Sequence, residues 1–325
     1  MKNIYYDISK ILSYNKLFNF IIGPRGNGKS FAAKKLVINN FIKKNKQFVY
    51  VRRYKTEMEH LTNFFSDIAM FYPDHTFEVE GKKFKIDGQL AGYAITLSTS
   101  QKEKSTSYPD VDYIIFDEFI IGKGKHVYLK NEVTVFFDLY ETIARMRDVK
   151  AIFISNSVTS MNPYFSYFKI VPNMKSKFVR GEEWVCERCD ASDYKDVKRN
   201  TRFGRLIAGT QYGEYAIENE FLEDNYAFIE KMPPDMHCIS VLRYMNKDYT
   251  LWYGDCGYYY ISDRKGESNI KFSLTTSDDM PNYIMLKTYK NHHVFKMLRY
   301  AYSIGYMRFE NLACKTMFYE LINLI

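Results

Sequence analysis

The sequence has no long apolar segment and no signal-peptide pattern. Lys, Arg, Asp or Glu interrupts every apolar run before it reaches the roughly 20 residues that a membrane helix needs. The amino-terminal stretch MKNIYYDISK lacks the apolar centre of a secretory signal. Cysteines are few and odd in number, five in 325 residues, which is not the pattern of a disulfide framework. We therefore expect a protein without a membrane partner that works in a reducing cytoplasm.

The amino-acid composition is typical of a globular protein. Hydrophobic residues make up 46% of the chain and aromatic residues 17%, far from the composition of a disordered protein. A chain of 325 residues exceeds the size at which one core usually stops growing, so we expect two domains. The formal net charge of +8 and the pI near 8.9 favour a polyanionic partner, although a merely basic protein would have the same charge.

The stretch FIIGPRGNGKS, which ends at Ser30, is the clearest functional signal. It matches the phosphate-loop pattern G-x-x-x-x-G-K-[ST] and lies between an apolar run typical of a strand and a helical pattern over 29–44. In such a loop the backbone N–H groups face a triphosphate, the lysine contacts the β and γ phosphates, and the hydroxyl holds Mg²⁺. A glycine turn without a ligand is the alternative, and the strand–loop–helix context argues against it. The expected ATP-binding residues are Gly23, Arg25, Gly26, Asn27, Gly28, Lys29 and Ser30, with Ser30 also a magnesium ligand.

A second apolar run, YIIFDEF, ends in two carboxylates and predicts the other half of an ATP site. Asp117 would hold Mg²⁺, and Glu118 would orient or deprotonate the attacking water. Standing alone, the pair would be read as acids at a strand end, but it accompanies a phosphate loop. A carboxylate placed to activate water favours hydrolysis over transfer to a bound acceptor.

A third strand pattern, KAIFISNS, ends in small polar residues. Asn156 would sense the γ-phosphate or the attacking water, and a residue that satisfies a local turn is an equal alternative. The helical pattern before this strand ends in Arg145 and Arg147. An arginine there could reach the phosphates of a neighbouring subunit, or both could complement the negative end of their own helix.

Strands that alternate with helices predict an α/β fold with a mainly parallel sheet covered on both faces. From about Gly181 to Asn225 the sequence becomes charged and glycine-punctuated, which indicates a linker, in part helical. After KMPPD, short strand patterns followed by helical ones predict a small α+β domain. We assign an ATPase domain to residues 1–195, a linker to 196–224 and a carboxyl-terminal domain to 225–325.

Three basic clusters follow predicted strands of the first domain. Clustered cations on loops of one ATPase domain favour nucleic-acid binding, although each cluster alone is better read as solvated surface. The clusters are Arg52, Arg53 and Lys55; Lys102 and Lys104; and Lys123, Lys125, His126 and Lys130. The candidate DNA-binding residues among them are Lys55, Lys123, Lys125 and Lys130. A single Cys186-x-x-Cys189 pair is weak grounds for zinc, and ordinary thiols are the favoured reading.

Several segments, taken in order, resemble the DNA-packaging ATPase of φ29-like bacteriophages, small relatives of the large terminases. They are ILSYNKLFNFIIGPRGNGKSFA, QFVYVRRYK, FDEFI, NEVTVFFDLYETIARMR, SNSVTSMNPYF and TRFGRLIAGTQYGEY. The resemblance implies a P-loop sheet of the additional-strand, catalytic-glutamate type. It also implies a homopentameric ring in the host cytoplasm, docked on the portal of an empty capsid, that drives double-stranded DNA inward with ATP and Mg²⁺. It makes Arg145 a trans-acting finger, Lys104 a second trans-acting residue, and a structural packaging RNA a candidate partner.

In large terminases the carboxyl-terminal domain is an RNase H-like nuclease with clustered acids on adjacent strands. Here the first candidate strand, CISVLRYM, carries no carboxylate, and Asp248, Asp255 and Asp263 are expected at turns. We therefore expect a vestigial nuclease-like domain without cleavage activity. Two other functions stay open: a P-loop phosphotransferase acting on a small molecule, and an assembly factor that binds nucleotide without useful turnover.

Overall fold

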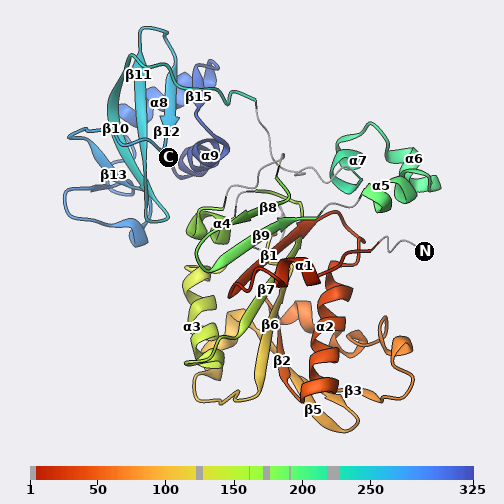
Figure 1. The fold of residues 1–325 in the computed structure, drawn as a ribbon. Helices are drawn as coiled ribbons and strands as arrows, with labels where there is room; N and C mark the ends of the chain where they lie inside the picture. Colours follow the sequence, from red (N-terminus) through yellow and green to blue (C-terminus); the bar gives the residue numbers. More distant parts are fainter. Residues whose placement is uncertain (1–4, 122–126, 161, 171–175, 190–191, 218–226) are drawn as a thin grey trace. The chain divides into compact units, whose positions relative to one another are not determined.

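The computed structural model describes residues 5–121, 127–160, 162–170, 176–189, 192–217 and 227–325 (Figure 1). The chain divides into two units, Met1–Glu223 and Asp224–Ile325. Each unit has its own sheet and its own core. Among the described residues, no helix is long and apolar enough to cross a membrane.

The first unit is organised by a nine-stranded sheet of order β3-β4-β5-β2-β6-β7-β1-β9-β8. All neighbouring pairs from β5 to β9 in this order are parallel, and the pairs at the two edges, formed by β3, β4 and β8, are antiparallel. The prediction of a mainly parallel α/β sheet is therefore confirmed. The strands are β1 (Phe18–Gly23), β2 (Gln47–Arg52), β3 (Phe77–Glu80), β4 (Lys83–Ile86), β5 (Gln89–Thr96), β6 (Val111–Asp117), β7 (Lys150–Asn156), β8 (Phe178–Arg180) and β9 (Trp184–Arg188).

Strand β7 lies between β1 and β6, so one additional strand separates the phosphate-loop strand from the acid-tipped strand. Gly23 at the end of β1 is in register with Asn156 at the end of β7, and Asp117 at the end of β6 is in register with Ile154. Because the three strands are parallel, their carboxyl ends meet at one edge of the sheet. The expectation of an additional-strand sheet is confirmed.

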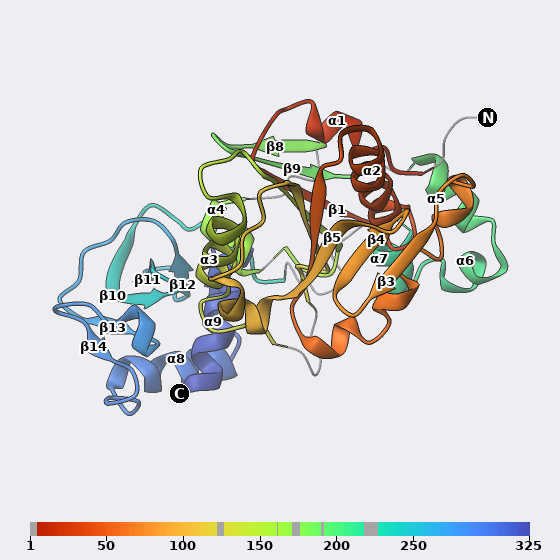
Figure 2. The ribbon, with the colours of Figure 1, turned by 90° about the horizontal axis from the view of Figure 1, so that it is seen from below.

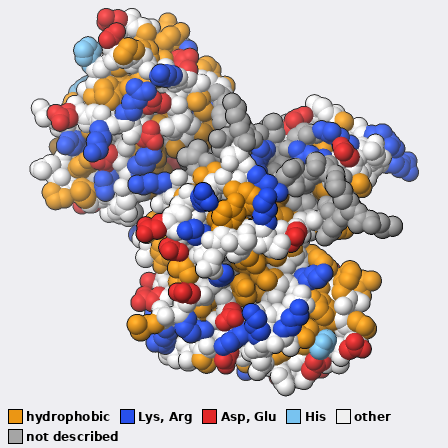
Figure 3. Space-filling view, viewed as in Figure 1, with side chains coloured by type: hydrophobic (Ala, Val, Ile, Leu, Met, Phe, Trp, Pro, Cys, Tyr) orange, Lys and Arg blue, Asp and Glu red, His pale blue; other side chains and the backbone are white. Residues whose placement is uncertain are grey.

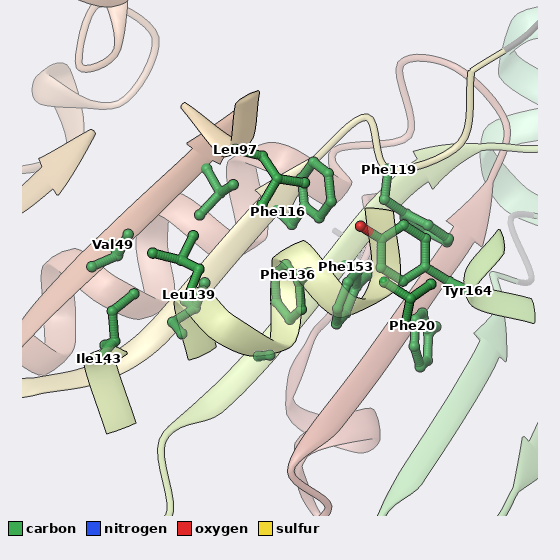
Figure 4. Close-up of a cluster of buried hydrophobic side chains, with 14 of the residues drawn as sticks. Phe20, Val49, Leu97, Phe116, Phe119, Phe136, Leu139, Ile143, Phe153 and Tyr164 are labelled. Carbon is green, nitrogen blue, oxygen red and sulfur yellow. The ribbon is translucent and has the colours of Figure 1, made fainter. Parts of the chain in front are cut away.

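Helices cover both faces of this sheet (Figure 2). Helices α1 (Ser9–Leu12) and α2 (Lys29–Lys44) pack on one face, where Ala33, Val37 and Phe41 of α2 recur at helical spacing and are buried. On the other face, α3 (Glu132–Ala144) and α4 (Pro163–Phe168) enclose a phenylalanine-rich core (Figure 4). Rings from the strands pack there against rings from the helices. For example, Phe116 of β6 stacks on Phe136 of α3, with ring centroids 5.7 Å apart. Short 3₁₀ helices fill the connections: η1 (Lys55–Met58), η2 (Leu61–Asn63), η3 (Ala69–Phe71) and η4 (Leu97–Glu103).

The charged stretch after Gly181 contains more structure than the sequence indicates. Its first part is β9, which pairs with β1 and with the edge strand β8, and its three central residues are buried. Three short helices follow, α5 (Ser192–Arg199), α6 (Arg202–Ile207) and α7 (Gln211–Ala216). The hydroxyls of Thr201 and Thr210 cap α6 and α7 by accepting from backbone N–H groups. The expectation of helix within this stretch is met, and its strand went unpredicted.

The second unit is a six-stranded mixed sheet of order β14-β13-β10-β11-β12-β15 packed against two helices. Strands β10, β11 and β12 form an antiparallel meander, and β13 and β15 extend it by parallel pairing. The α+β expectation is confirmed. The elements are β10 (Met236–Tyr244), β11 (Lys247–Gly254), β12 (Tyr259–Ser262), β13 (Lys271–Ser273), η5 (Thr276–Asp278), β14 (Ile284–Met285), α8 (His293–Ser303), β15 (Met307–Phe309) and α9 (Leu312–Leu324).

Candidate nucleotide site

The phosphate loop joins the end of β1 to the start of α2, as the sequence predicts. Gly26 and Gly28 have φ angles of 86° and 89°, in the left-handed region that side-chain-bearing residues rarely adopt. A Cβ on Gly26 would also lie 2.6 Å from the hydroxyl of Tyr194. Both glycines are therefore required by the loop's backbone, which supports the phosphate-loop assignment on local geometry.

Lys29 begins α2 with its ammonium buried under the loop, and the residue is 4% exposed. The ammonium donates to the carbonyls of Gly23 and Pro24 at 3.1 and 2.8 Å, and to the side-chain oxygens of Asn27 and Asn156 at 3.1 and 3.3 Å. All four acceptors are neutral, and burial lowers the pKa of Lys29 to about 8. A bound phosphate would supply the negative charge that this cation lacks among its hydrogen-bond partners.

Ser30 and Asp117 meet across the sheet edge. The Ser30 hydroxyl donates to Asp117 Oδ1 at 3.3 Å, and the Tyr50 hydroxyl donates to Asp117 Oδ2 at 3.1 Å. Burial raises the pKa of Asp117, against the attraction of Arg52, whose nearest nitrogen is 4.0 Å away. An alcohol and a buried carboxylate are hard oxygen ligands of the kind that Mg²⁺ prefers, so this pair fits the metal that the sequence predicts.

Glu118 follows Asp117 in a left-handed conformation with φ of 58°. Its carboxylate accepts from Arg52 at 2.6 Å, and its side chain is 55% exposed. Two donors of Arg53 hold the turn from behind, bonding the carbonyls of Glu118 and Phe119 at 3.1 and 2.7 Å. The turn therefore points Glu118 outward at the sheet edge, next to the Ser30–Asp117 pair.

Arg53 is 1% exposed and forms a fully buried ion pair with Glu132 at 2.8 Å. The Tyr164 hydroxyl donates to the same carboxylate at 3.1 Å. The expectation that Arg52 and Arg53 belong to a surface cluster is wrong, because one holds Glu118 and the other holds the backbone beneath it. Both arginines lie at the end of β2, and β2 is next to β6 in the sheet. The sequence shows that they follow a strand, but it does not show which strand is the neighbour, so these contacts could not be predicted from it.

Arg145 lies at the far end of the sheet from the phosphate loop. Helix α3 runs from the carboxyl edge of β6 to the amino end of β7, and its 13 residues span about 20 Å. Arg145 has φ of 52° and caps α3, and its side chain has no hydrogen-bond or ion-pair partner among the described residues. It lines a cavity of about 560 Å³ together with Lys104, Asp138 and Glu141. Arg147 differs, since its guanidinium donates to three backbone carbonyls.

Helix α5 packs directly on the phosphate loop. The Tyr194 hydroxyl and the Lys198 ammonium both donate to the carbonyl of Arg25, at 3.0 and 3.1 Å. Lys198 also donates to the carbonyl of Ala216 at 2.7 Å, which ties α5 to the end of α7. The helices after β9 are thus joined to the loop that faces the phosphates. No pattern in the sequence indicates this contact.

The chain matches known proteins over nearly its whole length. A family model described as podovirus DNA encapsidation protein (Gp16) matches residues 1–324. The chain belongs to this family. The DNA packaging protein of Bacillus phage phi29 is 42% identical over 323 residues, 98% of this chain and 97% of that protein. That of Bacillus phage B103 is 40% identical over 314 residues, 96% of this chain and 98% of that protein.

Solved structures extend this likeness to the fold. A chain of the bacteriophage Phi-29 viral genome packaging motor assembly matches with a TM-score of 0.82 at 40% identity, over 99% of both chains. The amino-terminal domain of the DNA packaging ATPase from bacteriophage phi29 matches with a TM-score of 0.56 at 46% identity, over 59% of this chain and 99% of that domain. The Phi-28 gp11 DNA packaging motor shares the fold, with a TM-score of 0.69 at 20% identity over 99% of this chain and 98% of that chain.

Only two of the four candidate DNA-binding lysines lie within the described residues. Lys55 in η1 and Lys130 before α3 are exposed. Lys123 and Lys125 lie outside the described residues. On the face drawn in Figure 3, basic and acidic side chains are interspersed, so this view shows no continuous basic surface.

Cys186 and Cys189 are buried, at 2% and 3% exposed. Burial raises the pKa of both thiols, that of Cys189 to about 12, so both are protonated at neutral pH. Within the part of the chain that the structure describes, no group of three or more His, Cys, Asp or Glu residues could hold a metal ion. The two cysteines therefore read as packing residues, with Cys189 against Gly23 of the loop.

Three carboxylates of the second unit, Asp248, Asp263 and Glu310, are paired with cations, and Asp255 lies exposed in the turn after β11. Asp248 is the second residue of β11, rather than lying at a turn, and it accepts from Arg243 at 2.9 Å. Asp263 follows β12 and accepts from Lys247 at 2.7 Å, and Glu310 pairs with Arg264. Charges neutralised in this way are poor ligands for a catalytic metal.

Proposed function

We propose that this protein is the ATPase of a phage DNA-packaging motor, which hydrolyses ATP to move double-stranded DNA into a preformed capsid. One observation carries the proposal: in a chain related over its full length to phage packaging proteins, Ser30 of the phosphate loop and Asp117 of the acid-tipped strand meet at 3.3 Å. Lys29 and Asn156 meet beside them at 3.3 Å. Two segments far apart in the sequence thus form one phosphate and metal site.

The side chains have separate roles in this proposal. Lys29 and the loop N–H groups bind the phosphates, and Ser30 and Asp117 hold Mg²⁺, which neutralises phosphate charge when it is bound. Asn156, bonded to Lys29, contacts the γ-phosphate. Glu118 orients the attacking water and accepts its proton, which requires Arg52 to release or share its carboxylate. A water-activating acid supports hydrolysis over transfer to a bound acceptor.

Arg145 acts on the nucleotide of a neighbouring subunit. It lies at the opposite end of α3 from its own phosphate loop, so it cannot reach its own nucleotide without unfolding that helix. Lys104 lines the same cavity, where it pairs weakly with Asp138 at 3.5 Å, and it presents a second cation to the neighbour. Such an arrangement requires an oligomeric ring, and we propose a homopentamer.

The ring would dock on the portal of the procapsid in the host cytoplasm and bind DNA through surface lysines that include Lys55 and Lys130. Lys123 and Lys125 are proposed for the same role from their sequence alone. A structural packaging RNA is a further candidate partner. The second unit is proposed to lack nuclease activity, because its acids Asp248, Asp263 and Glu310 are paired with Arg243, Lys247 and Arg264.

The direct test is ATP hydrolysis by the purified protein with DNA and portal present. Lys29→Ala should abolish nucleotide binding, and Glu118→Gln should retain binding while turnover falls by about a hundredfold or more. Persistence of wild-type turnover in both variants would refute the hydrolytic mechanism. Analysis of the phosphorylated product separates hydrolysis from phosphotransfer, since only the former yields free phosphate.

Mixed rings test the role of Arg145. Arg145→Ala subunits should poison the activity of wild-type partners, so that turnover falls faster than the fraction of mutant subunits. A matched variant, Arg147→Ala, removes a neighbouring arginine that holds its own backbone. A strictly proportional loss with Arg145→Ala would show that the residue acts within its own subunit or has no role.

A further inference from the structure

Tyr50 lies on β2, next to the strand that carries Asp117. It is in register with Ile115 of β6, two residues before Asp117, and side chains two residues apart on a strand share one face of the sheet. Tyr50 and Ile115 both belong to the core on the α2 side of the sheet. The tyrosine ring is long enough to reach a diagonal neighbour on the next strand, and its hydroxyl lies 3.1 Å from Asp117 Oδ2.

The ring of Tyr50 is held by two buried phenylalanines. It meets Phe64 edge to face with ring centroids 5.1 Å apart, and Phe84 nearly at a right angle with centroids 6.4 Å apart. Phe64 and Phe84 in turn pack on each other at 4.3 Å. Because side chains in a close-packed core cannot shift independently, the Tyr50 hydroxyl is presented to Asp117 from a fixed position.

Packing alone does not require this hydroxyl. The other rings of the cluster, Phe48, Phe64 and Phe84, are phenylalanines that fill the same core without a polar group. A hydroxyl taken into such surroundings costs free energy unless it is hydrogen-bonded. Among the hydrogen bonds of the described residues, the one that the Tyr50 hydroxyl donates goes to Asp117.

The two oxygens of the Asp117 carboxylate have separate partners. Oδ1 accepts from the Ser30 hydroxyl at 3.3 Å and from the Glu118 N–H at 3.1 Å, and Oδ2 accepts from Tyr50. The last torsion of an aspartate side chain has broad preferences, so the chain geometry alone does not decide which oxygen faces Ser30. The donor on Oδ2 fixes this torsion and leaves Oδ1 directed at Ser30.

Tyr50 orients Asp117 without cancelling its charge. The cation nearest to Oδ2, Arg52, is 4.0 Å away and donates to Glu118 at 2.6 Å instead. Burial and the Asp117 carboxylate raise the pKa of Tyr50 well above its usual range, against the opposing effect of Arg52, so the hydroxyl keeps its proton and donates. A lysine in this place would compensate the negative charge that a divalent cation needs, whereas a neutral phenol leaves it available.

We propose that Tyr50 is a positioning residue of the metal site, whose hydroxyl holds the Asp117 carboxylate in the orientation in which Asp117 and Ser30 together receive Mg²⁺. The inference rests on the proposed function, because it assumes that the site binds ATP with Mg²⁺. Tyr50 acts through Asp117 and contacts neither the nucleotide nor the metal. Partners that orient a metal ligand in this way typically contribute about 10–100-fold in metal affinity.

The experiment measures binding of a non-hydrolysable ATP analogue to the full-length protein by titration calorimetry, once with Mg²⁺ and once with EDTA. The ratio of the two dissociation constants is the gain in affinity due to the metal. Tyr50→Phe keeps the ring and removes the hydroxyl. It should lower this gain by about tenfold or more and leave the affinity in EDTA unchanged.

Tyr113→Phe is the matched control. Tyr113 lies on β6 on the same face as Asp117, four residues earlier, and packs against the same core. Loss of its hydroxyl should leave the affinity at the wild-type value both with Mg²⁺ and with EDTA. Thermal unfolding in EDTA should give the two variants similar midpoints, which shows that a loss of metal affinity in Tyr50→Phe is not a loss of fold.

Steady-state phosphate release gives a second readout. Tyr50→Phe should raise the Mg²⁺ concentration for half-maximal turnover by about tenfold, while turnover at saturating Mg²⁺ stays within about twofold of the wild type. A hydroxyl that only supports the fold would instead lower turnover at every Mg²⁺ concentration. That result would overturn the inference.

A double-mutant cycle tests whether Tyr50 acts through Asp117. In an Asp117→Asn background, Tyr50→Phe should cause no further loss of the metal-dependent gain in affinity, because the carboxylate that it orients is already absent. A further loss of the same size as in the wild-type background would show that the hydroxyl acts elsewhere, and the inference would be wrong.

The outcomes separate this inference from the proposed function. If Tyr50→Phe binds the analogue as the wild type does in both conditions, while Lys29→Ala abolishes binding, the phosphate site stands and the role of Tyr50 is refuted. Equal weakening with Mg²⁺ and with EDTA would make Tyr50 a support of the whole site, and would refute its role in metal binding. If the wild-type protein binds the analogue equally well in both conditions, the metal site of the proposed function itself fails.

Discussion

The two units of the chain both carry carboxylates at the ends of strands, but they surround them differently. In the first unit, burial raises the pKa of Asp117, and its hydrogen-bond partners include the hydroxyls of Ser30 and Tyr50. In the second unit, burial would also raise the pKa of Asp263, but the hydrogen bond and charge of Lys247 outweigh it and lower that pKa. Asp117 has its cation, Arg52, only at 4.0 Å, whereas Asp263 has Lys247 at 2.7 Å.

The difference shows how a sheet edge becomes a site. Acidic residues at strand ends are common, and they hold a metal only if the protein leaves part of their charge uncompensated. Asp117 also lies beside a buried lysine whose acceptors are all neutral, so this edge of the first sheet brings together charges that a magnesium triphosphate would satisfy. Asp263 and Glu310 are satisfied by their own chain.

Removal of one carboxylate from each unit is the largest expected contrast. Asp117→Asn should lower ATP turnover by at least about a hundredfold, because a buried metal ligand is lost. Asp263→Asn should leave ATP turnover at the wild-type level. Steady-state release of phosphate at saturating Mg²⁺ measures both. Equal losses in the two variants would mean that the second unit contributes to the nucleotide site.

The ion pairs of the two units should differ in stability. Arg53→Met leaves Glu132 buried without its cation and should cost about 3–5 kcal/mol in free energy of unfolding. Arg264→Met breaks a pair in which the arginine side chain is 44% exposed, and should cost less than about 1 kcal/mol. Urea unfolding followed by fluorescence gives the two values. A small loss with Arg53→Met would show that Glu132 finds another partner.

Buried lysines provide a third contrast, through pH. Burial lowers the pKa of Lys29 to about 8, so below pH 8 the free protein already carries the ammonium that phosphate needs. Above pH 8 the free lysine is neutral and must take up a proton when nucleotide binds, so affinity should fall by about tenfold per pH unit. Titration calorimetry at pH 7, 8 and 9 in buffers of different ionisation enthalpy measures this uptake. Lys315→Met, which removes a lysine that is 2% exposed in the second unit, should leave the proton uptake unchanged.

The smallest expected effect concerns the contact of α5 with the loop. Tyr194→Phe removes one of two donors to the carbonyl of Arg25, and Lys198 keeps the other, so nucleotide affinity should change by about threefold. Tyr300→Phe in the second unit is the control. A change in nucleotide affinity above tenfold would mean that α5, α6 and α7 set the conformation of the phosphate loop.

Local patterns predicted much of this architecture. The helical pattern over 29–44 coincides with α2, the pattern YIIFDEF overlaps β6 over residues 113–117, and KAIFISNS contains β7. These segments have apolar residues at the period of their own element, which a sequence displays directly. The charged stretch that holds β9 was not recognised, because its strand is only five residues long and its buried members include Glu187.

The phosphate loop and the acid-tipped strand are legible in the residues alone, because their chemical requirements are expressed within a few neighbouring positions. The residues alone do not show that Arg52 and Arg53 hold Glu118 and its backbone rather than a DNA-binding surface, nor that Tyr5, Phe31 and Phe71 line one cavity. These contacts depend on how the chain folds. Strand order places β2 beside β6, and chain folding brings the segment before β1 against α2. Burial and partnership are properties of neighbours in space, and a charge or a ring carries no mark of them in the sequence.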